Sequence, residues 1–145
     1  MVNVQTEIHI NRPRAEVADF AANPENAPRW YVNIHKSQRL DSGPLGPGSK
    51  VAFTAKFLGR ELKYTYEFVD YVSGEKLVMR TAQGPFPMQT TYTWTDDAGG
   101  TRMTLGNSGS PSGFSRLAGL VMEPIIRRET GRDLEKLKSI LEARR

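Results

Sequence analysis

The sequence contains no cysteine and only two histidines, His9 and His35, among its 145 residues. The absence of cysteine excludes a disulfide framework, a thiolate nucleophile and a cysteine metal site. The two histidines lie in separate segments, and no carboxylate spacing completes a set of metal ligands around either one. We therefore expect neither a metal ion nor any other cofactor.

Long hydrophobic runs are also missing. No apolar run approaches the roughly 20 residues that cross a membrane. Residues Met1 to Ile10 alternate in polarity and lack the apolar block of a signal peptide. We expect a cytoplasmic chain without integral membrane association. With 38% hydrophobic and 25% charged residues, the chain has the size and composition of one globular domain over residues 1–145.

The charge is not one-sided. The net charge is +4, from 20 basic and 16 acidic residues. The basic excess lies near the carboxyl end, but Asp133 and Glu135 interleave there with Arg132, Lys136 and Lys138. Such mixing is typical of a solvated helix face with local ion pairs. We therefore expect no nucleic-acid partner.

Two segments resemble catalytic loops only superficially. In Gly43–Lys50 the lysine follows the serine, whereas a phosphate-binding loop needs lysine directly after its last glycine. Gly109–Gly113 reads G-S-P-S-G, with proline where a hydrolase would present its nucleophilic serine. Neither segment predicts an active site.

What the chain does contain is a succession of short segments with alternating polarity, which is typical of strands with one buried face. Such segments begin at Val4, Ile34, Val51, Leu62, Leu77, Met88 and Met103. Turn residues separate them, most clearly the D-D-A-G-G run at 96–100. Between the first and second strands, Val17, Phe20 and Ala21 predict one short helix, and residues 23–31 predict a second helix or turn.

The carboxyl-terminal stretch from Phe114 to Arg145 predicts one long amphipathic helix. Its apolar stripe consists of Phe114, Leu117, Val121, Ile125, Leu134, Leu137 and Leu141, and charged residues, Asp133 among them, fill most other positions. At ~1.5 Å per residue this helix would be about 45 Å long. Pro124 should kink it or divide it, while Ala118, Gly119 and Gly131 leave room on its surface. This room allows either close packing on a sheet or a hollow.

These elements predict an α+β fold, in which a seven-stranded antiparallel sheet wraps around the long helix. Tyr64, Tyr66, Tyr92 and Trp94 should face the helix. A buried tyrosine hydroxyl needs a partner, so several on one face either form a polar network or line a cavity with water or ligand in it. Methionines on the same face would give such a cavity adaptable apolar walls.

Four segments carry a resemblance to a known family: N-R-P-R-A-E-V-A-D-F after the first strand, N-P-E-N-A-P-R-W, the G-G-T-R-M-T-L hairpin, and R-R-E-T-G-R-D-L-E-K-L-K in the last helix. Over nearly the whole chain the sequence resembles the polyketide cyclase and dehydrase-like branch of the START-related superfamily, also called SRPBCC. The resemblance implies the helix-grip fold, with a hydrophobic ligand such as a lipid, quinone or polyketide between sheet and helix.

Carried over to this chain, the resemblance implies a ligand cavity lined by Trp30, Tyr64, Tyr66, Met79, Met88, Tyr92, Val121, Met122 and Ile125. The main hypothesis is therefore binding or transport of a small hydrophobic ligand. The alternative is an aromatase or cyclase acting on a polyketide, with a tyrosine holding an enolate, although the spacing shows no facing acid and base pair. A third is a protein-interaction or co-chaperone module. A monomer and a homodimer are both compatible with the sequence.

Overall fold

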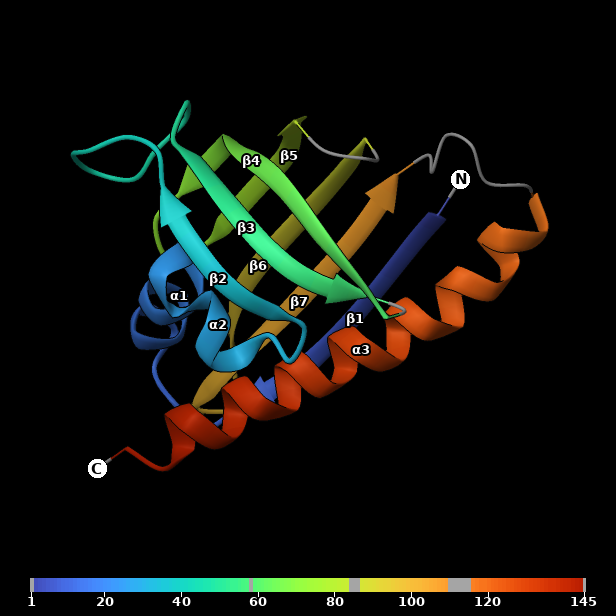
Figure 1. Ribbon diagram of the computed structural model, residues 1–145. Helices are drawn as coiled ribbons and strands as arrows, with labels where there is room; N and C mark the ends of the chain where they lie inside the picture. The colour runs from blue at the N-terminus through green and yellow to red at the C-terminus, as the bar shows by residue number, and fades with distance from the viewer. Residues whose placement is uncertain (1, 58, 84–86, 110–115, 145) are drawn as a thin grey trace.

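A computed structural model describes residues 2–57, 59–83, 87–109 and 116–144 of the chain (Figure 1). In chain order its elements are β1 (Val2–Ile10), α1 (Arg14–Ala22), the 3-10 turn η1 (Pro24–Asn26), α2 (Ala27–Trp30), β2 (Ile34–Arg39), β3 (Lys50–Phe57), β4 (Arg60–Val72), β5 (Lys76–Gln83), β6 (Met88–Asp97), β7 (Gly100–Gly109) and α3 (Arg116–Glu142). This confirms the predicted fold class, with seven strands, short helices between the first two, and one long helix.

The seven strands form one antiparallel sheet in the order β1-β7-β6-β5-β4-β3-β2. Strands β2 to β7 follow one another as a meander, and β1 joins the far edge beside β7, from Val2 opposite Gly109 to Ile10 opposite Thr101. The β6–β7 hairpin has a two-residue turn in which Ala98 and Gly99 adopt φ values of 48° and 81°. Two positive φ angles are what a type I′ turn requires.

The sheet is strongly curled, so its concave face encloses the interior (Figure 1). Register shifts between Thr65 and Tyr66 and between Phe68 and Asp70 interrupt the β4–β5 pairing. Such irregularities increase the local twist and bend a strand. They fall in β4, the longest strand, which must follow the curve of the sheet over 13 residues.

Helix α3 runs along β1 in the same direction, and polar contacts tie the two together at several levels. Thr6 Oγ1 lies 3.2 Å from Thr130 Oγ1, Lys138 Nζ donates to the carbonyl of His9 at 2.6 Å, and the N–H of Asn11 donates to Glu142 Oε2 at 2.8 Å. The 12 residue steps from Thr130 to Glu142 rise about 18 Å along the helix, close to the ~17 Å that the five steps from Thr6 to Asn11 cover in extended chain. Because these two lengths are nearly equal, α3 and β1 can contact each other repeatedly along this stretch.

The helix continues on both sides of Pro124, so the proline does not divide it. The first stripe residue, Phe114, lies outside the described residues. A Cβ added at Gly131 would meet nothing within 4 Å apart from the helix itself. Close packing on the sheet is therefore not the reason for glycine at this position.

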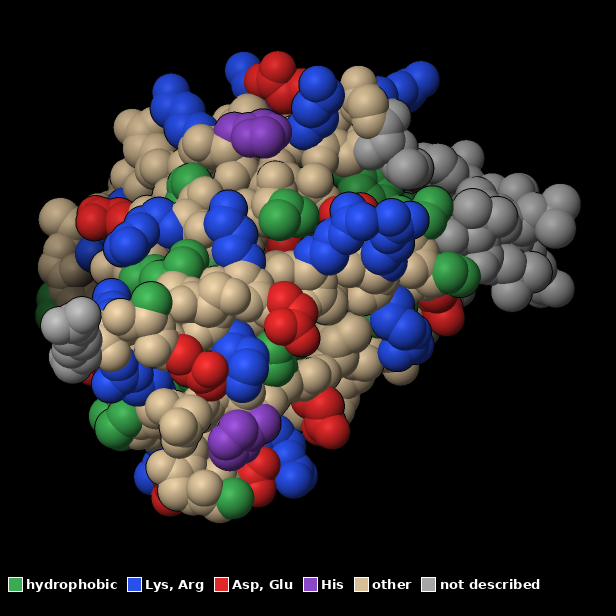
Figure 2. All heavy atoms as spheres, turned by 90° about the horizontal axis from the view of Figure 1, so that it is seen from below, with side chains coloured by type: hydrophobic (Ala, Val, Ile, Leu, Met, Phe, Trp, Pro, Cys, Tyr) green, Lys and Arg blue, Asp and Glu red, His purple; other side chains and the backbone are tan. Residues whose placement is uncertain are grey.

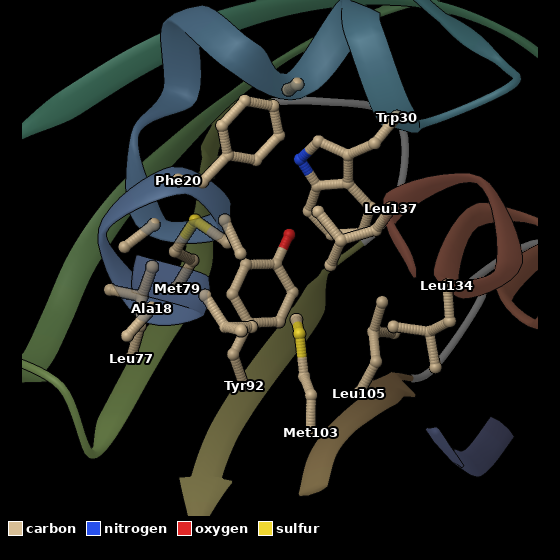
Figure 3. Packing of buried hydrophobic residues seen from close by; sticks show 14 of the residues in the cluster. Ala18, Phe20, Trp30, Leu77, Met79, Tyr92, Met103, Leu105, Leu134 and Leu137 are labelled. Carbon is tan, nitrogen blue, oxygen red and sulfur yellow. The ribbon is translucent and has the colours of Figure 1, made fainter. Parts of the chain in front are cut away.

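The hydrophobic core lies at the end of the molecule where α1, α2 and the last turns of α3 meet the sheet. Leu134, Leu137 and Leu141 of α3 are at most 1% exposed, as are Trp30 of α2 and Trp94 of β6. Figure 3 shows Trp30 and Leu137 facing Tyr92 and Met103 from the sheet. This end is filled with side chains, which leaves the other half of the concave face for a cavity.

The outer surface mixes both signs of charge. Figure 2 views the face that carries α3, where lysine and arginine side chains alternate with aspartate and glutamate. An i,i+4 pair joins Lys138 and Glu142 at 2.8 Å. Among the described helices, none combines the length and hydropathy that a membrane crossing requires.

Candidate functional site

A cavity of about 170 Å³ lies between the concave face of the sheet and the middle of α3. It is lined by Tyr31, Asn33, Ile34, Phe53, Ala55, Phe57, Leu62, Tyr64, Tyr66, Met79, Thr81, Met88, Thr90, Tyr92, Asn107, Met122, Ile126, Glu129, Thr130 and Asp133. A cavity of ~150 Å³ with apolar walls is large enough to bind benzene. A space of this volume therefore fits a ring-sized group or a short chain.

Strand alternation places the sheet side of this lining. In β3 the burial alternates from Val51 through Phe53 to Ala55, and the last two of these face the cavity. Opposite them in β4, Tyr64 pairs with Phe53 and Leu62 pairs with Ala55. Because side chains of directly paired residues lie on the same face of a sheet, neighbouring strands build one continuous wall.

One end of the cavity holds hydroxyls and carboxyls. The Tyr31 and Tyr92 hydroxyls form a hydrogen bond with each other. Asp133 Oδ1 accepts a hydrogen bond from the backbone N–H of Val32 at 2.9 Å, and Glu129 Oε2 accepts one from Asn33 Nδ2 at 3.1 Å. The segment between α2 and β2 is thus attached to α3 by two carboxyl groups that also line the cavity.

Burial changes the acidity of this cluster. Desolvation raises the pKa of Asp133 to about 7, with a further rise from the nearby Glu129 and opposing effects from the Val32 N–H and Lys136. Burial also raises the pKa of Tyr31 and Tyr92 well above the usual value for a phenol. The tyrosines are therefore neutral at ordinary pH, whereas Asp133 exchanges its proton near neutrality.

A second set of hydrogen-bonded polar side chains lies on strands β4, β6 and β7 of the sheet. The Tyr66 hydroxyl oxygen is 2.8 Å from Thr90 Oγ1, and Thr90 Oγ1 donates to Asn107 Oδ1 at 2.8 Å. Because the single hydroxyl hydrogen of Thr90 is used on Asn107, the Tyr66 hydroxyl is the donor toward Thr90. Desolvation raises the pKa of Tyr66 to about 12, although the bond to Thr90 lowers it. This chain of three side chains satisfies buried polar atoms and fixes the Tyr66 ring.

The residues implied by the family resemblance divide into three groups in the structure. Those among the cavity lining are Tyr64, Tyr66, Met79, Met88, Tyr92 and Met122. Trp30 is fully buried in the core beside Tyr31 and Tyr92, with ring centroids 4.3 and 5.7 Å away, and it is not a lining residue. Ile125 is also outside the lining, where Ile126 takes its place, and the side chain of Val121 lies outside the described part of the structure.

Asp133 is the residue that sequence reasoning missed. The sequence pattern assigns it to the solvated face of the helix, but its side chain is only 3% exposed and faces the cavity. A signal was present in the apolar stripe, which has a gap between Ile125 and Leu134. At helical spacing this gap is filled by Glu129, Thr130 and Asp133, so the inner face of α3 is polar where the cavity lies.

The charge of the lining has one sign. Glu129 and Asp133 are its charged side chains, and no lysine, arginine or histidine is among the lining residues that the structure describes. Within the same described part of the chain, no three histidine, cysteine, aspartate or glutamate side chains are grouped as metal ligands would be. The site therefore offers carboxyl and phenol groups on otherwise apolar walls.

Residues 1–142 match the model of a family described as polyketide cyclase/dehydrase and lipid transport. The chain belongs to this family. No curated protein matches the sequence at a significant level.

Solved structures with similar folds include two bacterial proteins. The protein TTHA0849 from Thermus thermophilus superposes with a TM-score of 0.83 at 15% sequence identity, covering 98% of this chain and 99% of that one. The Zhui aromatase/cyclase from Streptomyces sp. R1128 gives a TM-score of 0.82 at 16% identity, covering 97% and 93%. At such identities the likeness establishes the helix-grip fold and leaves the ligand to the chemistry of the site.

Proposed function

We propose that this protein binds or transports a small hydrophobic ligand, such as a lipid, a polyketide, a quinone or a similar aromatic molecule, in the cavity beneath α3. The observation that carries the proposal is the cavity itself, a partly open space of about 170 Å³ with mostly apolar walls and a few polar groups among its lining residues. Ligand sites in proteins commonly have this composition. Membership of a family that includes lipid transport supports the same function.

The walls suit a flat or flexible apolar group. Met79 and Met88 are unbranched and adapt to a ligand's shape, whereas Phe53, Tyr64 and Tyr66 form a packed aromatic group with ring centroids 5.2 to 6.0 Å apart. Burial of apolar ligand surface contributes about 25 cal/mol per Å². The polar cluster of Tyr31, Tyr92 and Asp133 then sets the orientation of any polar group on the ligand.

The test is to isolate the protein from its own source and identify what is bound. Native mass spectrometry gives the mass of any complex, and solvent extraction followed by chemical identification gives the ligand class. An apolar compound at close to one per chain would support the proposal. An empty protein that also shows no thermal shift with a broad panel of lipids, quinones and aromatic compounds would contradict it and favour a role in protein interaction.

A second candidate is an aromatase or cyclase that acts on a polyketide. The buried carboxyl group of Asp133 beside the cavity is the observation that favours it. A buried carboxyl with a pKa of about 7 can both remove and return a proton near neutral pH. Tyr31, Tyr64 and Tyr92 are neutral donors that could hold a developing enolate oxygen. The Zhui protein, an aromatase/cyclase, shares the fold.

Kinetics separate the two candidates. If the protein is a cyclase, Asp133→Asn removes turnover of a polyketide substrate and leaves the affinity for a non-reacting analogue within a few-fold. If it is a carrier, the wild-type protein releases the same compound unchanged after prolonged incubation. Product formation by both the wild type and the Asp133→Asn variant would exclude Asp133 as the proton-transfer group.

A further inference from the structure

The charge of the cavity restricts which ligands can enter it. Glu129 and Asp133 lie one turn apart on α3, and both side chains line the cavity. The basic residue that acts on Asp133 is Lys136, which is exposed on the same helix and outside the lining. No basic side chain of the described lining balances the two carboxyls. A ligand with a negative charge would therefore meet like charges in a poorly solvated space.

Each carboxyl is held through one oxygen. Asp133 uses Oδ1 to accept from the Val32 N–H, and Glu129 uses Oε2 to accept from Asn33 Nδ2. Neither Asp133 Oδ2 nor Glu129 Oε1 has a hydrogen-bond donor among the described residues. Asp133 is nevertheless buried, with 3% of its surface exposed. A carboxyl group that is held in place beside a cavity, with one oxygen lacking a donor, is positioned to receive a donor from a ligand.

The aromatic side chains around these carboxyls favour a cation over a neutral donor. The rings of Tyr31, Tyr64 and Tyr92 all belong to the lining, and the hydroxyl of Tyr64 has no hydrogen-bond partner among the described residues. Aromatic rings attract ammonium groups through their π faces, particularly where water is excluded. An ammonium group also carries several donors and can pair with two carboxyls, whereas a single hydroxyl has one donor.

We propose that the ligand is a cationic amphiphile, with a protonated amine between Asp133 and Glu129 and its apolar part against Phe53, Met79 and Met88. This inference rests on the proposed binding function and specifies the ligand class. It also predicts discrimination: an amine is preferred to a neutral compound of the same shape, and a carboxylate of that shape is excluded.

The affinity should depend on pH through the cavity carboxyls. The groups facing Asp133 are Glu129 and Lys136 on α3, Tyr31 after α2, Tyr64 on β4 and Tyr92 on β6. The pKa values of these tyrosines are raised by burial, so the phenols stay neutral between about pH 5 and pH 8. Protonation of Asp133 as the pH falls removes the negative charge that attracts the amine. Amine binding should weaken toward about pH 5, and binding of a neutral alcohol should not.

Three small probes with one skeleton test the proposal: 2-phenylethylamine, 2-phenylethanol and phenylacetate. Each is titrated into the full chain at about pH 8, and the amide and methyl signals of cavity residues are followed by nuclear magnetic resonance. We expect the amine to bind at least about tenfold more tightly than the alcohol, because it forms one ion pair with a partly desolvated carboxylate. Phenylacetate should bind weakest. An alcohol or carboxylate that binds as tightly as the amine would overturn the proposal while leaving the binding function intact.

Two variants locate the effect. Asp133→Asn should lower the affinity for the amine by about tenfold and leave that for the alcohol within about twofold. Glu135→Gln removes the same charge from an exposed position on α3 and should change neither. Equal loss in both variants would show a general charge effect and overturn the assigned site. If none of the three probes shifts a cavity signal, the inference is overturned, whereas the binding function is decided separately by native mass spectrometry and the thermal-shift panel.

Discussion

The backbone N–H of Val32 donates to Asp133 Oδ1 at 2.9 Å, although 101 residues separate the two positions in sequence. This bond joins the segment after α2 to the helix that covers the sheet. It gives a buried carboxyl one partner and thereby offsets part of the cost of its burial. The same side chain thus attaches the cavity wall to α3 and faces the cavity, so its substitution should affect both stability and binding.

Asp133→Asn should stabilise the protein at alkaline pH, because Asn retains an acceptor for the Val32 N–H and carries no charge. The pKa of Asp133 is about 7 in the folded chain against a usual 3.8. Between these values the folded state holds a proton that the unfolded state has released, so the wild-type stability falls as the pH rises through this range. At ~1.4 kcal/mol for each pKa unit, the ionised Asp133 lowers the free energy of unfolding above pH 7 by at most about 4 kcal/mol.

Chemical denaturation of both proteins at about pH 5 and pH 8 checks this prediction. The advantage of the Asp133→Asn variant should be larger at pH 8 than at pH 5, by up to about 3 kcal/mol. Glu135→Gln, at an exposed position, serves as the control and should show little difference between the two pH values. An Asp133→Asn variant that is less stable than the wild type at pH 8 would contradict the assignment of a destabilising buried charge.

The Tyr31 and Tyr92 hydroxyls should be energetically coupled. Tyr31→Phe leaves the Tyr92 hydroxyl without its partner, and Tyr92→Phe does the same to Tyr31. Each single change is expected to cost about 1–3 kcal/mol of the free energy of unfolding, because a buried polar group loses its hydrogen bond. The double variant should cost less than the sum of the two, by about 0.5 kcal/mol or more. A double-mutant cycle measured in denaturant tests this, and strict additivity would show that the two hydroxyls do not interact.

Filling the cavity should block binding while leaving the fold intact. Ala55→Leu adds a larger apolar side chain to the lining from β3, and the added surface replaces that of a ligand. Ala52→Leu is the matched control, because Ala52 lies on the same strand and outside the cavity lining. Ligand-induced thermal shifts should disappear in the first variant and persist in the second. An unchanged affinity in the Ala55→Leu variant would place the ligand elsewhere.

Gly131→Ala should stabilise the protein. Gly131 lies inside α3, and an added Cβ would meet nothing within 4 Å apart from the helix itself. Alanine in a helix interior is favoured over glycine by about 1 kcal/mol, because glycine loses more conformational freedom on folding. A rise in the denaturation midpoint of the Gly131→Ala variant, without a change in the slope, would confirm the gain. In contrast, Gly100→Ala would bring a Cβ within 2.5 Å of the Ile10 carbonyl oxygen and should destabilise the hairpin.

Strand alternation and turn residues were sufficient to predict the sheet. The alternation from Val51 to Phe57 and the D-D-A-G-G turn at 96–100 correspond to β3 and to the β6–β7 hairpin. These signals are local, because the side-chain period of two and a two-residue turn are both set within a few residues. The register shifts in β4 could not be predicted in this way, since they depend on how the whole sheet curls.

The site was less predictable because it depends on where the helix meets the sheet. Charged residues usually point to solvent, and for this reason the sequence analysis placed Asp133 on the wrong face of α3. The family resemblance implied Trp30 as a lining residue, but its side chain is buried in the core beside Tyr31 and Tyr92 and is not part of the lining. The hydrogen bond between Val32 and Asp133 joins segments that are distant in sequence, so no local pattern could reveal it.

The strand order also has a consequence for how the chain reaches its native state. Strands β2 to β7 pair with their immediate neighbours in sequence, whereas β1 pairs only with β7 in the sheet. During synthesis the first strand therefore waits for its partner until Gly109 has emerged, and α3 follows later still. Non-local pairing of this kind slows folding. We therefore expect the meander to form first and the cavity, part of whose lining comes from α3, to be completed only when this helix docks on the sheet.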